Sequence, residues 1–167
     1  MPTAFAETES RFRADPSAAH ATPTVTATLV NGHARLSAGA FNWDADLAPA
    51  IGGGNLAPSP TAYLLGALAG CGVAFLRDTL APQFDVEIDD VTAIASASSD
   101  TRGLLGMDGV APNLGDLRIA ITVASASPTE RVEATLAAWR ERCPIYLVLR
   151  DPNDVTVTTE ISATAPA

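Results

Sequence analysis

Residues 59–80, SPTAYLLGALAGCGVAFLRDTL, decide the fold of this chain. Ser59 and Pro60 are typical of an N-cap followed by a first helical residue, because proline has no N–H to lose there and its fixed φ suits a helix start. Four residues at i, i+4, i+7 and i+11 then form one apolar stripe: Leu64, Leu68, Cys71 and Phe75. The stretch therefore predicts a helix that points the thiol of Cys71 inward.

This helix is expected to be central and buried. No charge lies between Ala62 and Leu76, and small side chains let other elements approach closely: Gly66, Ala67, Ala69, Gly70, Gly72 and Ala74. The helix is predicted to be too short to span a bilayer, which takes roughly 20 apolar residues. Arg77 and Asp78 close it with charge.

Composition narrows the possible classes of function. The 167 residues predict one domain, residues 21–167, behind a polar arm, residues 1–20, that becomes ordered only against another surface. With 47% hydrophobic and 17% charged residues, the chain has more apolar surface than one small domain covers comfortably, which favours an obligate homodimer. The net charge of −9 argues against a nucleic-acid partner.

The N-terminal sequence and the two cysteines bear on location and cofactors. The first residues have neither a basic nor an apolar signal region, and no membrane span is expected, so the predicted location is cytoplasmic with no membrane partner. Cys71 and Cys143 match neither a CxxC motif nor a zinc ligand set, so neither a metal nor another cofactor is predicted. From spacing alone, both are interpreted most simply as buried free thiols.

Three antiparallel strands are predicted before the helix. Residues 24–30 are rich in β-branched side chains and alternate, and Asn31-Gly32 is a two-residue hairpin turn signal. A return strand over 33–37 and a third strand over 41–45 follow. The triglycine 52–54 is a weak candidate for a phosphate-binding loop, since it lacks the following Lys and Ser/Thr.

Beyond the helix, Pro82 predicts a helix stop and residues 86–97 predict a long strand. Residues 100–116 form a glycine-rich loop that is expected to lie over a pocket with three apolar side chains, Leu104, Leu105 and Met107. One face of the next strand is marked by four apolar residues: Leu117, Ile119, Ile121 and Val123.

A second long helix is predicted to begin at a capping box, Ser127 to Glu130. Its apolar stripe is again at i, i+4, i+7 and i+11: Val132, Leu136, Trp139 and Cys143. Pro144 interrupts this helix, another helical turn follows, and residues 155–161 predict a last strand. The resulting order, βββ-α-ββ-α-β, is an α+β arrangement of two long helices on antiparallel sheet.

Two helices that each point a cysteine inward can bring the two sulfurs within disulfide reach, although spacing alone does not show that they meet. Here the chain resembles a known family. The segments PTAYLLGALAGC, RGLLGMDGVAPNLGDLRI and RCPIYLVL resemble the OsmC/Ohr family of osmotically inducible and organic-hydroperoxide-resistance proteins, over roughly residues 24–161. The most specific parts are the helix around Cys71 and the Cys143-Pro144 pair.

The resemblance implies antiparallel sheets wrapped around two central helices in an intertwined homodimer, with a thiol peroxidase site at the subunit boundary. It implies that Cys71 reacts with an organic hydroperoxide to give a sulfenic acid, and that Cys143 resolves it as a disulfide that an external dithiol reduces. The preferred substrate is expected to be an aliphatic hydroperoxide rather than hydrogen peroxide.

One departure from the family pattern concerns the activation of the thiol. Ohr-type enzymes have a Glu directly after the proline that opens the first helix, and an Arg on an early strand, and this pair lowers the thiol pKa. Here Thr61 follows Pro60, and the stretch around Asn31 has no arginine at the family's position. Arg35 lies nearby but out of register, and Arg102 is a candidate replacement.

Two alternatives stay open from the sequence. The first is a non-catalytic small-molecule-binding protein of the same fold that has lost the activating pair. The second and more distant one is a cysteine-dependent hydrolase, for which His33 is the only plausible histidine partner of Cys71. His20 lies in the arm, and no HExxH or GxSxG motif occurs.

Overall fold

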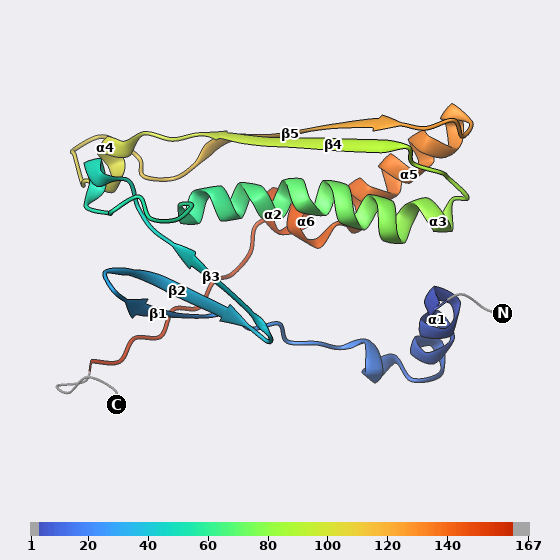
Figure 1. Cartoon of the computed structure of the whole chain (residues 1–167), viewed down its shortest axis with the longest axis horizontal. Helices are drawn as coiled ribbons and strands as arrows, with labels where there is room; N and C mark the ends of the chain where they lie inside the picture. The colour runs from blue at the N-terminus through green and yellow to red at the C-terminus, as the bar shows by residue number, and fades with distance from the viewer. Residues whose placement is uncertain (1–3, 162–167) are drawn as a thin grey trace. The chain divides into compact units, whose positions relative to one another are not determined.

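The computed structural model describes residues 4–161 of the chain. It forms two compact units, which divide between Ser59 and Pro60 and are described separately here. Both units contain an antiparallel sheet, and helices accompany them, so the predicted α+β class is confirmed (Figure 1).

The N-terminal unit is built on a three-stranded antiparallel sheet in the order β1-β2-β3. Its strands are β1 Thr26–Val30, β2 His33–Ala38 and β3 Phe41–Ala45, and a helix, α1 Ala4–Ala14, lies within the predicted arm. Asn31 and Gly32 have φ values of 50° and 85°, as a type I′ turn requires. The predicted hairpin and third strand are therefore confirmed.

The triglycine loop of this unit is organised by the buried carboxylate of Asp46. Three backbone N–H groups donate to this carboxylate, those of Leu47, Gly54 and Leu56. These bonds, with that from Leu56 the strongest, hold the pKa of Asp46 below its ordinary value. A Cβ on Gly53 would lie 1.9 Å from the Leu47 carbonyl oxygen, so only glycine fits there.

The C-terminal unit packs helices on a long two-stranded ribbon. The ribbon consists of β4 Asp90–Ser98 and β5 Gly115–Ala124, and it runs alongside α2 Pro60–Phe75 (Figure 1). The remaining elements are α3 Ala81–Gln83, α4 Thr101–Leu104, α5 Thr129–Arg142 and α6 Pro144–Arg150. Strand β4 begins later than predicted, because a turn at residues 84–85, where Asp85 has a φ of 52°, and irregular residues 86–89 precede it.

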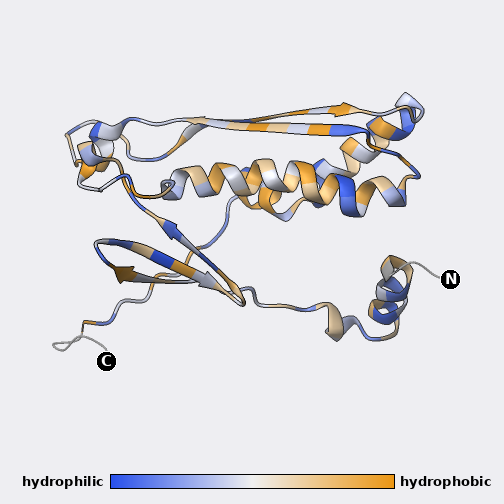
Figure 2. Cartoon of the chain, in the orientation of Figure 1, coloured by the Kyte–Doolittle hydropathy of each residue, from blue (hydrophilic) through white to orange (hydrophobic). Residues whose placement is uncertain are grey.

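Helix α2 packs three residues of its predicted stripe, Leu68, Cys71 and Phe75, into the core, whereas the fourth, Leu64, is exposed, so the helix is less buried than predicted. The buried cluster contains Leu68, Leu76, Leu80, Ala138, Trp139 and Cys143. Gly72 faces the ribbon so closely that an added Cβ would lie 3.1 Å from Ala93 and 3.2 Å from Ile119. Figure 2 shows the apolar residues along α2, and the outer part of the helix stays exposed, including Leu64 at 37%.

The helical run that begins at Pro60 does not stop where the sequence predicts. After Phe75 the register widens into a π-helical segment, Leu76–Leu80, and the run continues through Pro82 to Gln83. Pro82 is tolerated because it lies at the start of the new register, where its missing N–H costs nothing.

The length of this run also corrects the prediction about membranes. The 24 residues from Pro60 to Gln83 are long and apolar enough, by length and composition alone, to cross a membrane. The predicted shortness is therefore wrong, although core helices of soluble proteins satisfy the same criterion.

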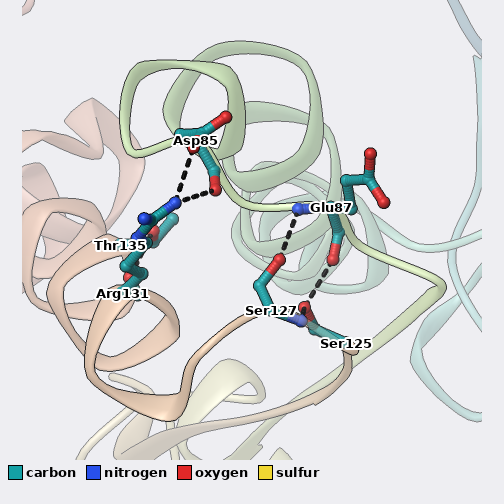
Figure 3. Close-up of polar contacts among 6 residues, drawn as sticks. All are labelled: Asp85, Glu87, Ser125, Ser127, Arg131 and Thr135. Carbon is teal, nitrogen blue, oxygen red and sulfur yellow. Dashed lines mark hydrogen bonds and ion pairs between the residues drawn. The ribbon is translucent and has the colours of Figure 1, made fainter.

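The predicted capping box at the start of α5 does not form (Figure 3). The N-cap is Pro128, without a side-chain capping bond. The Ser127 hydroxyl instead accepts a hydrogen bond from the backbone N–H of Glu87 at 2.9 Å. Ser125 donates to the Glu87 carbonyl and accepts from the Ser127 N–H, so both serines tie the turn before β4 to the start of α5.

The predicted last strand over residues 155–161 is absent from the described chain. The segment is extended but unpaired, and its apolar residues Val155, Val157 and Ile161 are 83%, 77% and 99% exposed. An alternating apolar pattern makes a strand only when a sheet edge accepts its backbone hydrogen bonds, and no edge within residues 4–161 does so.

Candidate functional site

The structure brings the two cysteines together. Their sulfurs are 2.8 Å apart, one from the middle of α2 and the other from the junction of α5 and α6. Both are free thiols. A disulfide bond is about 2.05 Å long, so the sulfurs need to approach by less than an ångström to bond. The matching stripes predicted two inward thiols, and the packing of α5 on α2 makes them meet.

Cys71 is half-buried on a continuous helix. Burial is the main cause that raises its pKa to about 12, and the hydrogen bond and charge of Cys143 add to the effect. A backbone hydrogen bond from Ile145, in the first turn of α6, acts in the opposite direction. The site as it stands in one chain therefore favours the neutral thiol of Cys71.

Cys143 lies at a break in the helical path. It is fully buried, and its extended backbone, with φ −68° and ψ 112°, separates α5 from α6. Pro144 opens α6 as predicted. The Cys143 sulfur accepts the backbone N–H of Tyr146 at 3.4 Å, so the thiol also serves as the N-cap of α6.

A third residue, Trp139, joins the two cysteines. Its side chain is 2% exposed, and its indole N–H donates to the backbone carbonyl of Cys71 at 3.1 Å. Its own carbonyl accepts the N–H of Cys143 at 2.9 Å. The sequence pattern predicts Trp139 only as a member of the core stripe. The indole N–H could have indicated a further contact, since a buried Trp usually needs a hydrogen-bond partner for this donor.

The candidate activating arginines are engaged elsewhere. Arg102 forms an ion pair with Asp100 at 2.6 Å, and Asp100 caps α4 by accepting the Arg102 backbone N–H. Arg35, in the N-terminal unit, pairs with Asp44. Thr61 lies in the exposed first turn of α2. Neither predicted arginine is therefore free of a carboxylate partner.

His33, the histidine of the hydrolase alternative, also lies in the N-terminal unit. Its Nε2 is 3.5 Å from Asp44, and its Nδ1 is buried without a hydrogen-bond partner among the described residues. The imidazole is thus oriented by the β2–β3 sheet rather than arranged as an activated base beside a nucleophile of its own unit.

The glycine-rich loop over residues 100–116 contains the short helix α4 and leaves its apolar residues uncovered. Leu104, Leu105 and Met107 are 61%, 60% and 52% exposed. Within a single chain these side chains project outward, and the expected cover over a pocket does not form there.

Two cavities lie beside Tyr146, whose backbone N–H donates to the Cys143 sulfur, and Ile119 lines both as well. One, of about 270 Å³, is also lined by Trp139 and Arg140, and the other, of about 240 Å³, by Arg118 and other residues of β5 and α6. Among the described residues no three His, Cys, Asp or Glu side chains cluster as a metal site would need.

Comparison with known proteins assigns the fold to a family. The model of the OsmC-like protein family matches residues 52–158, most of the chain and both cysteines. The chain belongs to the OsmC-like protein family.

Solved structures of OsmC-like proteins share this fold. An OsmC-like protein from Mycoplasma pneumoniae is 20% identical with a TM-score of 0.64, covering 78% of this chain and 88% of its own. An organic hydroperoxide resistance protein OsmC from Legionella pneumophila is 18% identical (TM-score 0.56; 79% and 91% covered). One from Elizabethkingia anophelis is 13% identical (TM-score 0.58; 78% and 89% covered). No curated protein matches the sequence.

Proposed function

We propose that this OsmC-like protein is a thiol peroxidase that reduces organic hydroperoxides. The observation that carries the proposal is the 2.8 Å separation of the Cys71 and Cys143 sulfurs, which suits two thiols that alternate between reduced and disulfide states. The organic hydroperoxide resistance proteins of the same fold, from Legionella and Elizabethkingia, suggest the substrate class.

In the proposed reaction the Cys71 thiolate attacks the terminal oxygen of the hydroperoxide. The O–O bond breaks, a sulfenic acid forms on Cys71, and the alcohol leaves with a proton. The Cys143 thiolate then attacks the Cys71 sulfur, so that the S–S bond forms and the sulfenic oxygen leaves as water. An external dithiol reduces the disulfide by two exchange steps and becomes a disulfide itself, which suits a reducing cytoplasm.

The burial of the two thiols supports this assignment of roles. Cys71 is half-buried, whereas Cys143 is fully buried, so a peroxide reaches the Cys71 sulfur first. Cys143 is also positioned to resolve, because the backbone break at Pro144 allows local adjustment that a continuous helix does not.

The raised pKa of Cys71 sets a further requirement for this activity. Near neutral pH a thiol with this pKa carries almost no thiolate, and only the thiolate is nucleophilic. Burial and Cys143 dominate the pKa of Cys71 in the single chain, so the active form needs an additional positive charge beside the sulfur. We propose that an obligate homodimer supplies it, and that a second chain also covers the exposed apolar residues of α2.

The raised pKa also favours a second candidate, a non-catalytic small-molecule-binding protein. An inert thiol is compatible with a binding role, and the two cavities beside Tyr146 offer apolar walls with an arginine for an anionic group.

Consumption of cumene hydroperoxide, tert-butyl hydroperoxide and hydrogen peroxide, each with a dithiol reductant in excess, tests the proposal. Catalytic consumption of the organic hydroperoxides, with slower turnover of hydrogen peroxide, is expected. Consumption equal to that of a control without protein would overturn the peroxidase and leave the binding protein.

A further inference from the structure

Trp139 makes three contacts that converge on the cysteine pair. The indole N–H donates to the Cys71 carbonyl at 3.1 Å, and the Trp139 carbonyl accepts the Cys143 N–H at 2.9 Å. The indole ring lies 5.3 Å from the ring of Tyr146, centroid to centroid, with an angle of 37° between the planes. Tyr146 in turn donates its backbone N–H to the Cys143 sulfur.

The bond from the Cys143 N–H to the Trp139 carbonyl is the ordinary i to i+4 bond of α5, whereas the indole bond joins α5 to another helix, α2. Helix α2 carries Cys71 and α5 carries Trp139, and between these helices the indole N–H is a directional bond, whereas the surrounding contacts are apolar and non-directional. Because Trp139 is 2% exposed, water does not replace the bond if the N–H is removed. The bond therefore fixes where the Cys71 turn of α2 lies along α5.

The position of the acceptor adds to this effect. The Cys71 carbonyl belongs to the last turn of regular α-helix before the π-helical segment at Leu76–Leu80. The regular register of α2 ends at Phe75, so this bond from α5 holds the helix one turn before its register changes.

We propose that Trp139 is a positioning residue for disulfide formation: its indole N–H holds the Cys71 turn of α2 against α5, so that the two sulfurs stay within bonding reach. This inference rests on the proposed Cys71–Cys143 disulfide. It assigns to Trp139 no contact with the substrate and no effect on the first attack on peroxide.

The test is a redox titration with reduced and oxidised glutathione, which needs no peroxidase activity. A Cys71 thiolate attacks oxidised glutathione and releases one glutathione thiolate, and Cys143 then displaces the second one as the protein disulfide forms. The ratio of disulfide to dithiol measures how effectively Cys143 is presented to Cys71. Trp139→Phe, which keeps a ring but loses the donor, is expected to lower this ratio about fivefold, as for one buried hydrogen bond.

A matched control separates positioning from general damage. Trp43→Phe makes the same change in β3 of the N-terminal unit and is expected to leave the glutathione ratio unchanged. In a Cys143→Ser background, Trp139→Phe is expected to leave unchanged the rate at which iodoacetamide alkylates Cys71, because that reaction does not involve the second sulfur. A merely structural role would alter both readouts together.

Trp139→benzothienylalanine, which keeps the two-ring shape and replaces the N–H by sulfur, serves where Trp139→Phe does not fold. The same fivefold fall is expected. An unchanged ratio in this folded variant, with normal disulfide formation in the unmodified protein, overturns the role of Trp139. Failure of the unmodified protein to form a Cys71–Cys143 disulfide overturns the proposed function itself, and the two failures are thereby distinguished.

Discussion

The surroundings of Cys71 and Cys143 differ, although each cysteine belongs to an apolar stripe of the same spacing. In stripes with the spacing i, i+4, i+7 and i+11, Cys71 is the third member and Cys143 is the fourth. Cys71 lies within a continuous helix and is half-buried, whereas Cys143 lies at an extended residue between two helices and is fully buried. The periodicity of a stripe therefore fixes which way a side chain points. The residue after the cysteine differs: Gly72 continues the helix, whereas Pro144 follows a break in it.

The largest effect is expected from removing either thiol. Cys71→Ser is expected to abolish hydroperoxide turnover, because no nucleophile remains at the accessible position. Cys143→Ser is expected to consume about one equivalent of hydroperoxide per subunit and to stop at the Cys71 sulfenic acid, which is then open to over-oxidation. Peroxide consumption and intact-protein mass spectrometry measure both outcomes.

The reverse result would break the comparison between the two sites. Full turnover by Cys71→Ser would exclude the peroxidase mechanism, and normal turnover by Cys143→Ser with a dithiol would assign the resolving step to another thiol. Unmodified protein that is treated with the dithiol alone is the control for both variants.

A smaller effect is expected in the pH dependence of Cys71. Because its pKa is raised to about 12, the thiolate fraction grows with pH throughout the neutral and mildly alkaline range. If no second chain lowers this pKa, the rate of alkylation by iodoacetamide rises about tenfold per pH unit from pH 7 past pH 9 without a plateau, whereas the proposed dimer is expected to give a plateau near pH 8. Mass spectrometry of the Cys71 peptide follows the reaction.

Cys143→Ala sharpens this prediction, because it removes the neighbour that helps to raise the pKa of Cys71 while burial remains. Its rate profile is expected to bend at a lower pH than that of the unmodified protein. A plateau near pH 8 in the unmodified protein would show that a positive charge already activates the thiol, as the proposed dimer requires.

The smallest effect is expected far from the sulfurs, at the start of the helix that carries Cys143. Ser127→Ala removes the acceptor for the Glu87 N–H, and the free energy of unfolding is expected to fall by about 1 kcal/mol. Ser99→Ala, at an exposed serine just after β4 of the same unit, is the matched control and should change stability by no more than about 0.5 kcal/mol. Equal effects of both changes in urea denaturation would contradict a role for the Ser127 bond.

Local signals in the sequence predicted the parts of the fold that local interactions determine. The Asn31-Gly32 hairpin, the stripe of α2 from Leu68 to Phe75 and the Cys143-Pro144 break all depend on residues close in the chain, and all three are confirmed. The family assignment from the cysteine segments is likewise confirmed. Which thiol attacks and which resolves stays a prediction.

Contacts between distant segments caused the errors. Ser127 has the sequence of a capping box, but Glu87, forty residues earlier, takes its hydroxyl. Pro82 signals a helix stop, but the π-helical segment before it shifts the register. The alternating residues of 155–161 are typical of one face of a strand. A strand also needs a sheet edge to pair with, and that edge has to come from a distant segment. The bond from Trp139 to Cys71 was missed for the same reason.

The loop that follows Asp46 resembles an anion-binding site that is filled by the Asp46 carboxylate of the same chain. Its backbone amides converge as they do around a bound phosphate, but a carboxylate of the same loop occupies them. A tethered group acts at an effective concentration on the order of millimolar or higher, so a free anion competes poorly for these amides. The glycine-rich segment is thus a structural loop closed by its own carboxylate, and it leaves the chemistry of the protein to the two sulfurs.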